Sequence, residues 1–210
     1  VKDRAEKYQV TVVANSTSTT YDGRVHSAKG LESTTVIADG RTFTVEGLTT
    51  SNPEGTDAGE YTNHITGTAV IKDKAGNDVT SQFKVTTVDG KLTIAKRDVR
   101  IKPVKASKEY DGTALVATDF EVVSGSFAEG EGIESCTYAG QQIQVGTSES
   151  AIETVKPKAN TNLDKNYNLR KDPGALTVTN RDADAKYKIE VEAKSATATY
   201  DGEEHAASGL

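Results

Sequence analysis

The sequence predicts an all-β protein made of small domains repeated in tandem, and three observations lead to that prediction. The tripeptide Tyr-Asp-Gly occurs at Tyr21, Tyr110 and Tyr200, with spacings of 89 and 90 residues. Short segments rich in Thr, Val and Ile alternate apolar and polar residues, and turn-forming pairs separate them. No segment carries the apolar stripe of a helix. A period of about 90 residues matches a small complete domain, so we expect an array.

The alternation is clearest in four segments of the first repeat, which are Tyr8–Ala14, Arg41–Glu46, Phe83–Val88 and Lys91–Ala95. Turns are expected at Asp22-Gly23, Asp39-Gly40, Gly76-Asn77, Asp89-Gly90, Asp111-Gly112 and Asp172-Pro173-Gly174. Several short strands with one polar face predict a two-sheet sandwich of the immunoglobulin-like (Ig-like) kind. The alternative is a β-grasp-like unit, a small sheet crossed by a helix, and only Thr161–Leu169 is a candidate for a helical turn.

Two landmarks divide the chain into units. Tyr8–Leu31 aligns without a gap with Tyr187–Leu210, and 12 of the 24 positions are identical. The segment Gly90–Ile94 recurs as Gly174–Val178 near the end of the second unit. The predicted units are a type A repeat at 1–97, a type B repeat at 98–181, and the first strand and turn of a third, incomplete repeat at 182–210.

The segments that join the repeats are short and charged, at 95–99 and 179–186, so we expect the units to sit end to end. The segment 187–210 supplies one strand and a turn, which cannot fold alone. We expect it to be loosely ordered or to add its strand to a neighbouring sheet edge.

Four motifs recur or stand out along the chain: the Tyr-Asp-Gly turn, the Asp57–Tyr61 stretch (Asp-Ala-Gly-Glu-Tyr), the Asn166-Tyr167 pair and the closing strand. Together they resemble the Tyr-Asp-Gly (YDG/MBG) Ig-like repeats that recur in tandem in bacterial surface proteins and adhesins. Type A has Gln82-Phe83 in place of Asn-Tyr, and type B keeps only Val145-Gly146 of the mid-domain stretch. The resemblance implies an extracellular stalk or spacer on a bacterial cell surface that projects a distal functional domain.

The Tyr-Asp-Gly motif is expected to be structural. Gly accepts a left-handed backbone, Asp can bond back to nearby amides, and Tyr can bury its ring at the end of a strand. The spacing in Asp57–Tyr61 resembles a tyrosine corner, in which the hydroxyl bonds to nearby backbone. The predicted framework residues are Tyr21, Asp22, Gly23, Tyr110, Asp111, Gly112, Tyr200, Asp201 and Gly202.

Charge argues against nucleic-acid partners, because the net charge is -6 and the 25 basic residues form no stripe. No apolar run is long enough to cross a bilayer, so this segment is not expected to insert into a membrane. No signal peptide is present, and any export or anchoring signal is expected outside this segment.

Catalytic and cofactor chemistry is not expected. Glu129 and Glu131 are a chance pair among 31 carboxylates, and Cys136 has no nucleophile motif around it. Of the histidines at 26, 64 and 205, the repeated pair His26 and His205 belongs to different units, so the three are not expected to converge on one metal. Weak calcium candidates are Asp73, Asn77 and Asp78, and a Lys–Asn amide crosslink between Lys102 or Lys105 and Asn168 is a further hypothesis.

Two functions remain open at this stage. The first is a non-enzymatic spacer whose partners are the neighbouring repeats of the same chain. The second is an adhesive module that binds a host glycan or matrix protein through variable loops, for which Leu48–Glu60 and Ser124–Glu134 are the candidates.

Overall fold

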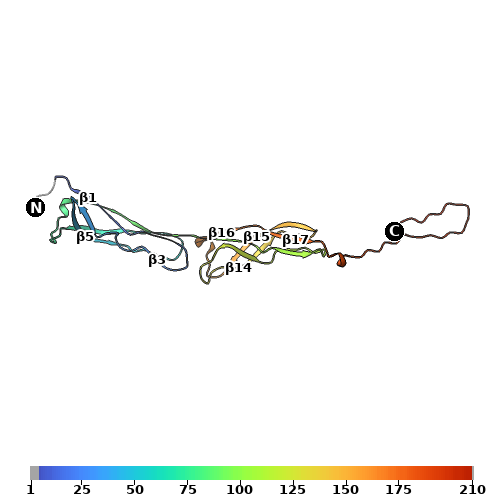
Figure 1. The fold of residues 1–210 in the computed structure, drawn as a ribbon. Coiled ribbons are helices and arrows are strands. Elements are labelled where there is room, and N and C mark those ends of the chain that lie inside the picture. Colours follow the sequence, from blue (N-terminus) through green and yellow to red (C-terminus); the bar gives the residue numbers. More distant parts are fainter. Residues whose placement is uncertain (1–4, 210) are drawn as a thin grey trace.

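The computed structural model describes residues 5–209, and the chain is an all-β protein. Figure 1 shows two strand-rich bodies arranged end to end, followed by a tail that runs away from the second body. The first body, unit A, contains β1 (Tyr8–Val13), β2 (Thr17–Thr20), β3 (His26–Ser27), β4 (Thr35–Ala38), β5 (Arg41–Thr50), β6 (Glu54–Gly55), β7 (Gly59–Asn63), β8 (Ile65–Lys72), the 3₁₀ turn η1 (Thr80–Gln82), β9 (Phe83–Val88) and β10 (Gly90–Ala95).

The second body, unit B, contains β11 (Arg97–Pro103), β12 (Ala106–Glu109), β13 (Phe120–Gly125), β14 (Ile133–Ala139), β15 (Gly146–Pro157), α1 (Leu163–Asn166), β16 (Tyr167–Lys171) and β17 (Gly174–Thr179). Only Lys96 separates β10 from β11. A longer segment, which includes the 3₁₀ turn η2 (Ala183–Ala185), follows β17. The helical turn expected within Thr161–Leu169 is present as α1, whereas η1 was not expected.

The first and last strands of each unit run side by side in the same direction. In unit A, β1 pairs with β9 and β2 pairs with β10, and partners in both ladders are 75 residues apart, as in Tyr8–Phe83 and Thr17–Leu92. In unit B, β11 pairs with β16 and β12 with β17, with partners 70 residues apart, as in Arg97–Tyr167. The chain therefore enters each unit at one end and leaves it at the other.

Two of the predicted turns are wrong. The two parallel ladders of a unit have the same offset between paired residues, so the chain keeps its direction at Asp89-Gly90 and at Asp172-Pro173-Gly174. The strand instead continues and changes its neighbours. Glycine is needed there for space, since a Cβ on Gly90 would lie 2.2 Å from the backbone oxygen of Asn15, and one on Gly174 would lie 2.7 Å from Cβ of Pro103.

The Gly90→Ala variant should therefore unfold more easily than the parent chain. The added methyl group meets backbone atoms that cannot rotate away, so we expect a loss of about 1–3 kcal/mol, as for other overpacked sites. Urea unfolding followed by circular dichroism measures the loss. Lys91→Ala, a change at the exposed neighbouring residue, is the control and should unfold like the parent. Equal stability of Gly90→Ala and parent would contradict the close-approach explanation.

The remaining pairs are antiparallel and complete the sheets. In unit A, β7 pairs with β10, β5 lies between β4 and β8, and β3 pairs with β6. In unit B, β13 pairs with β11, and β15 lies between β17 and β14. The predicted strands Tyr8–Ala14, Phe83–Val88 and Lys91–Ala95 correspond to β1, β9 and β10. The expected Asp39-Gly40 turn joins β4 to β5 with positive φ at both residues.

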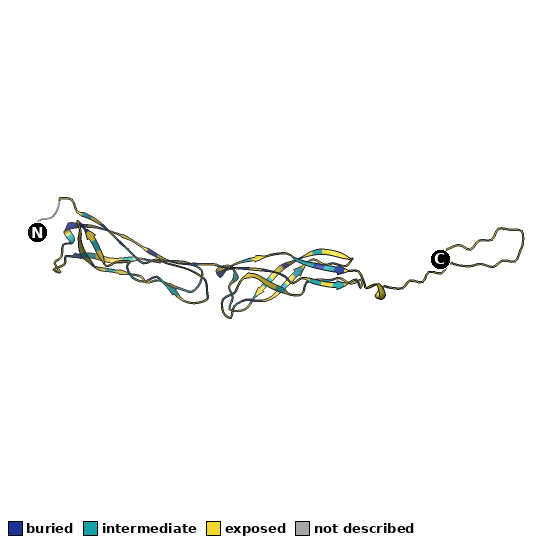
Figure 2. Ribbon diagram, viewed as in Figure 1, coloured by how far each residue is buried: buried dark blue, intermediate teal, exposed yellow. Residues whose placement is uncertain are grey.

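Buried side chains form two hydrophobic clusters. One lies within unit A and contains Val10, Val12, Ala38, Val45, Ile71 and Phe83. The other draws buried residues from both units. Figure 2 shows buried positions inside the two bodies and an exposed tail. Shared burial of this kind makes the contact between the units part of the core rather than a surface contact.

The tail differs from the complete units. Its described residues after η2 are exposed and contain no strand, although the turn at Asp201 forms, with the carboxylate accepting a hydrogen bond from the Glu203 amide at 3.0 Å. In units A and B the opening strand pairs with a closing strand, and the described part of the tail makes no such pair. Within the described residues, the tail adds no strand to a sheet of units A or B.

Candidate functional site

The joint between units A and B is the candidate site in the described part of the chain, because buried aromatic and polar side chains from both units meet there. Tyr21, at the end of unit A, is only 4% exposed and packs edge-on against Tyr167 of unit B, with ring centroids 5.5 Å apart. Such a geometry is favourable between aromatic rings. The shared cluster contains Tyr21, Ala28, Leu92 and Ile94 from unit A, and Val99, Ile101, Ala128, Ile133, Ile152 and Tyr167 from unit B.

Glu131 links the two tyrosines. One oxygen of its carboxylate accepts a hydrogen bond from the Tyr21 hydroxyl, and the other accepts one from the Tyr167 hydroxyl at 2.7 Å. Burial, reinforced by Glu131, raises the pKa of Tyr21 far above its usual range, and burial raises the pKa of Tyr167 to about 12. Both hydroxyls therefore stay protonated near neutral pH and can donate to the carboxylate.

A second contact across the joint is made by Asn166, which is 2% exposed. Its Nδ2 donates to Oδ1 of Asp57, and its Oδ1 accepts from the Ala58 amide, both at 2.9 Å. Lys165 Nζ lies 3.4 Å from Oδ2 of Asp57. The buried amide thus satisfies both its donor and its acceptor with groups of unit A, which fixes the relative position of the two units.

Two consecutive basic residues, Lys96 at the junction and Arg97 at the start of β11, hold the two units together through hydrogen bonds. Lys96 Nζ donates to the Asp164 carbonyl at 2.6 Å. Arg97 donates to the Ser126 carbonyl and hydroxyl at 2.6 and 2.7 Å, and to the Tyr21 carbonyl at 3.4 Å. The planar guanidinium can serve several oxygens at once, so Arg97 ties the end of unit A to a loop of unit B.

Three motifs found in the sequence meet at this joint. Tyr21 and Asp57 come from unit A, while Asn166 and Tyr167 come from unit B. Sequence reasoning treated Glu131 as one of a chance pair and gave no role to Arg97. No local signal marks Glu131, because its partner Tyr21 lies 110 residues away.

Both loops considered for ligand binding take part in the joint. Leu48–Glu60 contains Asp57 and Ala58, and Ser124–Glu134 contains Ser126, Phe127, Ala128 and Glu131 around the buried tyrosines. Each of these loops therefore makes contacts between the units, through Asp57 and Ala58 on one side and Glu131 on the other.

The three Tyr-Asp-Gly turns share one backbone design. The Asp carboxylate accepts from the amide two residues ahead, at 2.9 Å for Asp22 and Asp111 and 3.0 Å for Asp201. The three glycines have φ of 80, 83 and 82°. The tyrosines differ, since Tyr21 is buried, Tyr110 is half-buried and Tyr200 is 96% exposed. Position in the array, not the motif, decides burial.

The mid-domain tyrosine also has a local role. The Tyr61 hydroxyl donates to the Asp57 carbonyl at 3.0 Å, four residues back in the chain. Its ring occupies the space beside Gly55, where an added Cβ would lie 2.5 Å from the ring. The bond from the Tyr61 hydroxyl to nearby backbone is the one that the resemblance to a tyrosine corner predicts, and it positions the Asp57 loop, which contacts unit B.

The calcium candidates are engaged with their own loop. Asp73 accepts from the Ala75 and Asn77 amides and from the Asn77 side chain, each at 2.9 Å, and Asp78 accepts from Thr80. Within residues 5–209 no group of three or more His, Cys, Asp or Glu side chains could hold a metal ion. His26 and His205 bond to the Asp of their own turns, and His64 to Asp89.

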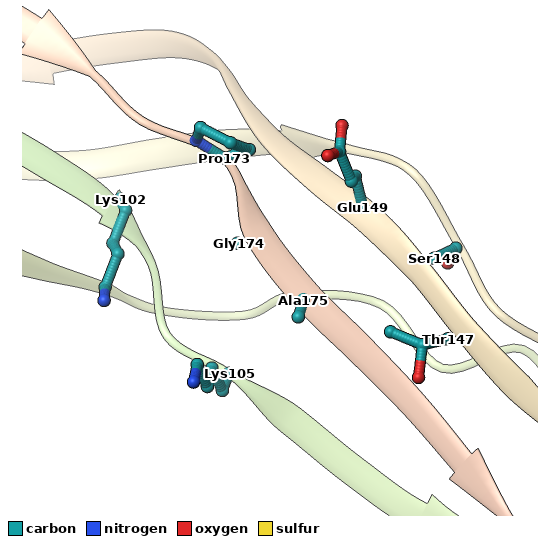
Figure 3. A pocket seen from close by; sticks show the side chains of 8 residues that line it. All are labelled: Lys102, Lys105, Thr147, Ser148, Glu149, Pro173, Gly174 and Ala175. Atoms are coloured by element: carbon teal, nitrogen blue, oxygen red, sulfur yellow. The ribbon is translucent and has the colours of Figure 1, made fainter.

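The structure does not bring together the hypothetical crosslink residues. Asn168 donates to Asp98 at 2.9 Å, and these two residues are paired in the β11–β16 ladder. Lys102 is four residues farther along β11, about 13 Å at the rise of a strand, and pairs with Glu121 at 3.1 Å. Figure 3 shows Lys102 and Lys105 beside a small pocket next to Gly174. The half-buried Cys136 lies within β14.

Acid should weaken the joint through Asp57. Its hydrogen bond from Asn166, followed by Lys165, lowers the pKa of Asp57 below its usual value. The ionised carboxylate therefore stabilises the folded state above about pH 4, and this contribution is lost as pH falls through the lowered pKa. The difference in urea midpoint between parent and Asp57→Asn should shrink from pH 6 to pH 3.

Asp201→Asn is the matched control, because the pKa of Asp201 is also lowered but the residue lies in the tail. Its urea midpoint should follow the parent at both pH values. A constant difference between parent and Asp57→Asn would show that the Asp57 charge has no part in the joint.

In comparisons with known proteins, no family model, curated protein or solved structure matches the chain. In the described part, no helix has the length and apolar character to cross a membrane.

Proposed function

We propose that this chain is a non-enzymatic spacer, a segment of an extracellular stalk that holds a distal domain away from a bacterial cell surface. The joint between units A and B carries the proposal. A buried tyrosine, a buried amide and a shared hydrophobic cluster hold two units end to end across a one-residue junction. A spacer needs such fixed joints, because flexible links would let the array fold back on itself.

The terminal strands support a load-bearing role. Tension on a stalk pulls the start of β1 and the end of β10 in opposite directions along the unit. The parallel β1–β9 and β2–β10 ladders lie along that direction, so they are loaded in shear and many hydrogen bonds share the force. The β11–β16 and β12–β17 ladders repeat the arrangement in unit B.

We further propose that each unit is a variant of the Ig-like sandwich. Mostly antiparallel pairing, the Tyr61 hydrogen bond and two short strand groups around a core support this assignment. The β-grasp-like alternative needs a helix that crosses the sheet, and the only α-helix in residues 5–209 has four residues.

The bacterial surface location rests on the resemblance of the four motifs, and the proposal that the loops are not adhesive rests on their use in the joint. A screen of glycans and matrix proteins with the full chain should therefore show no saturable binding. A reproducible ligand, lost when Leu48–Glu60 or Ser124–Glu134 is exchanged, would favour the adhesive alternative.

Residual dipolar couplings of the labelled full chain test the fixed joint directly. If the joint is rigid, couplings from unit A and unit B fit one alignment tensor. Two tensors of clearly different magnitude would mean that the units move independently, and the spacer proposal would then lose its main support.

A further inference from the structure

We propose that the two outer ends of this pair fit each other: the groove at the start of unit A binds the far end of a unit B from a second copy of the chain. This second kind of joint, B to A, rests on the proposed spacer function. In the sequence a type B repeat is already followed by type A residues, 187–210, so a B-to-A order is built into the chain.

The strand pairing shows which residues at the start of unit A correspond to those at the start of unit B. Tyr8 pairs with Phe83 in unit A, as Arg97 pairs with Tyr167 in unit B. Phe83 therefore occupies the position of Tyr167, the ring that receives Tyr21. The residue before it is Gln82, in the position of Asn166, and both are buried. The start of unit A thus has an aromatic and a buried amide residue at the same positions as the surface that unit B uses in the A-to-B joint.

That surface is a groove of about 1220 Å³ with an aromatic floor. Phe83 contacts Phe43 with ring centroids 4.9 Å apart and Tyr8 at 5.3 Å, and Val79 also lines the groove. Charged residues also line the groove, among them Arg41, Lys72 and Asp73. An apolar surface bordered by charged residues is typical of a protein-binding surface.

The matching end of unit B carries exposed apolar side chains. Gly146 pairs with Val178 as Gly59 pairs with Ile94, so Val145 stands where Ala58 stands in unit A, and Gln144 where Asp57 stands. Val145 is 47% exposed, Val116 46% and Ile143 37%. They lie near one another, because Leu115 bridges to Gln142.

The far end of unit B also has a counterpart of Tyr21, the buried tyrosine of the A-to-B joint. Tyr110, the counterpart of Tyr21, is half-buried, and Arg181 donates to its carbonyl at 3.3 Å, as Arg97 does to Tyr21 at 3.4 Å. The end of unit B therefore has an anchor tyrosine, a basic residue on its carbonyl and an exposed apolar rim.

The substitutions at the two ends are complementary. The A-to-B joint pairs Asp57 with Asn166 and Lys165, a charged and polar set. The B-to-A joint would bring the uncharged Gln144 and the apolar Val145 against Gln82 and Phe83. The end of unit B thus lacks the carboxylate that Asp57 gives unit A, and the start of unit A lacks the Asn-Tyr pair that unit B has. An end-to-end contact between different surfaces of identical copies produces a linear array.

A tandem chain tests this joint with native units: residues 1–186 are followed directly by a second copy of Tyr8–Leu210, so that Tyr8 replaces Tyr187 after the protein's own linker. Tethering raises the effective concentration of the two ends to the millimolar range. Hydrogen exchange with mass spectrometry should show about tenfold slower exchange at 110–117 and 140–146 of the first unit B than in the 210-residue chain.

Val145→Asp in the first unit B should abolish this protection. Val122→Asp, at a similarly exposed valine on β13 of the same unit, should leave it intact. In the 210-residue chain neither variant should change exchange at 110–117 or 140–146. Equal exchange in the tandem and single chains, or equal loss with both variants, would overturn the B-to-A joint. The A-to-B joint would survive that result, because it rests on contacts within one chain and is tested separately by the residual dipolar couplings.

Discussion

The Tyr21→Ala variant is expected to lose about 3–5 kcal/mol of stability, the range for a large aromatic side chain removed from a core. Tyr21 is 4% exposed, contacts the Tyr167 ring and donates to Glu131, so its removal leaves a cavity and a carboxylate without one of its donors. Urea unfolding of the full chain, followed by circular dichroism, measures the loss. We also expect the two units to unfold in separate transitions, because the shared cluster no longer couples them.

The chain supplies its own controls for this experiment. Tyr110→Ala removes the same motif residue from a half-buried site and should cost less. Tyr200→Ala changes a 96% exposed side chain and should stay within about 0.5 kcal/mol of the parent. If the three variants lose equal stability, the effect belongs to the turn and not to the joint. Glu131→Gln, which keeps the shape of the side chain, separates the role of the charge from that of packing.

Unit A should resist force far better along its length than across its terminal ladder. Handles at Lys7 and Lys96 load the β1–β9 and β2–β10 ladders in shear, so many hydrogen bonds must break together. Handles at Lys7 and Lys84 pull neighbouring strands apart from one end, and the bonds break one after another. Single-molecule pulling in a Cys136→Ser background should give a several-fold higher rupture force in the first geometry.

This comparison uses one fold and one set of bonds, so thermodynamic stability is the same in both measurements. Forced unfolding reports the barrier along the pulling direction. Similar rupture forces in the two geometries would show that the parallel ladders are not what resists tension. The rigid joint could then still hold the array extended, but the load-bearing part of the proposed function would be wrong.

Local patterns predicted strands well because an alternating strand has its own period and because its ends carry turn residues. Tyr8–Ala14 and Phe83–Val88 were placed within one residue of β1 and β9. The failures at Asp89-Gly90 and Asp172-Gly174 have a common cause. Asp-Gly and Asp-Pro-Gly are strong turn signals, but here Gly serves a close approach between strands that are 75 residues apart in unit A and 70 in unit B, which no local pattern reports.

The sequence by itself determined the all-β class, the repeat order and the Tyr-Asp-Gly turns, since these depend on contacts within a few residues. Only the tertiary structure decided that one of three identical motifs is buried, that Glu131 joins two tyrosines, and that the closing strands run parallel to the opening ones. The physical reason is the range of the interactions. A turn is closed by its own residues, whereas the joint depends on side chains about 110 residues apart that meet only when both units are folded.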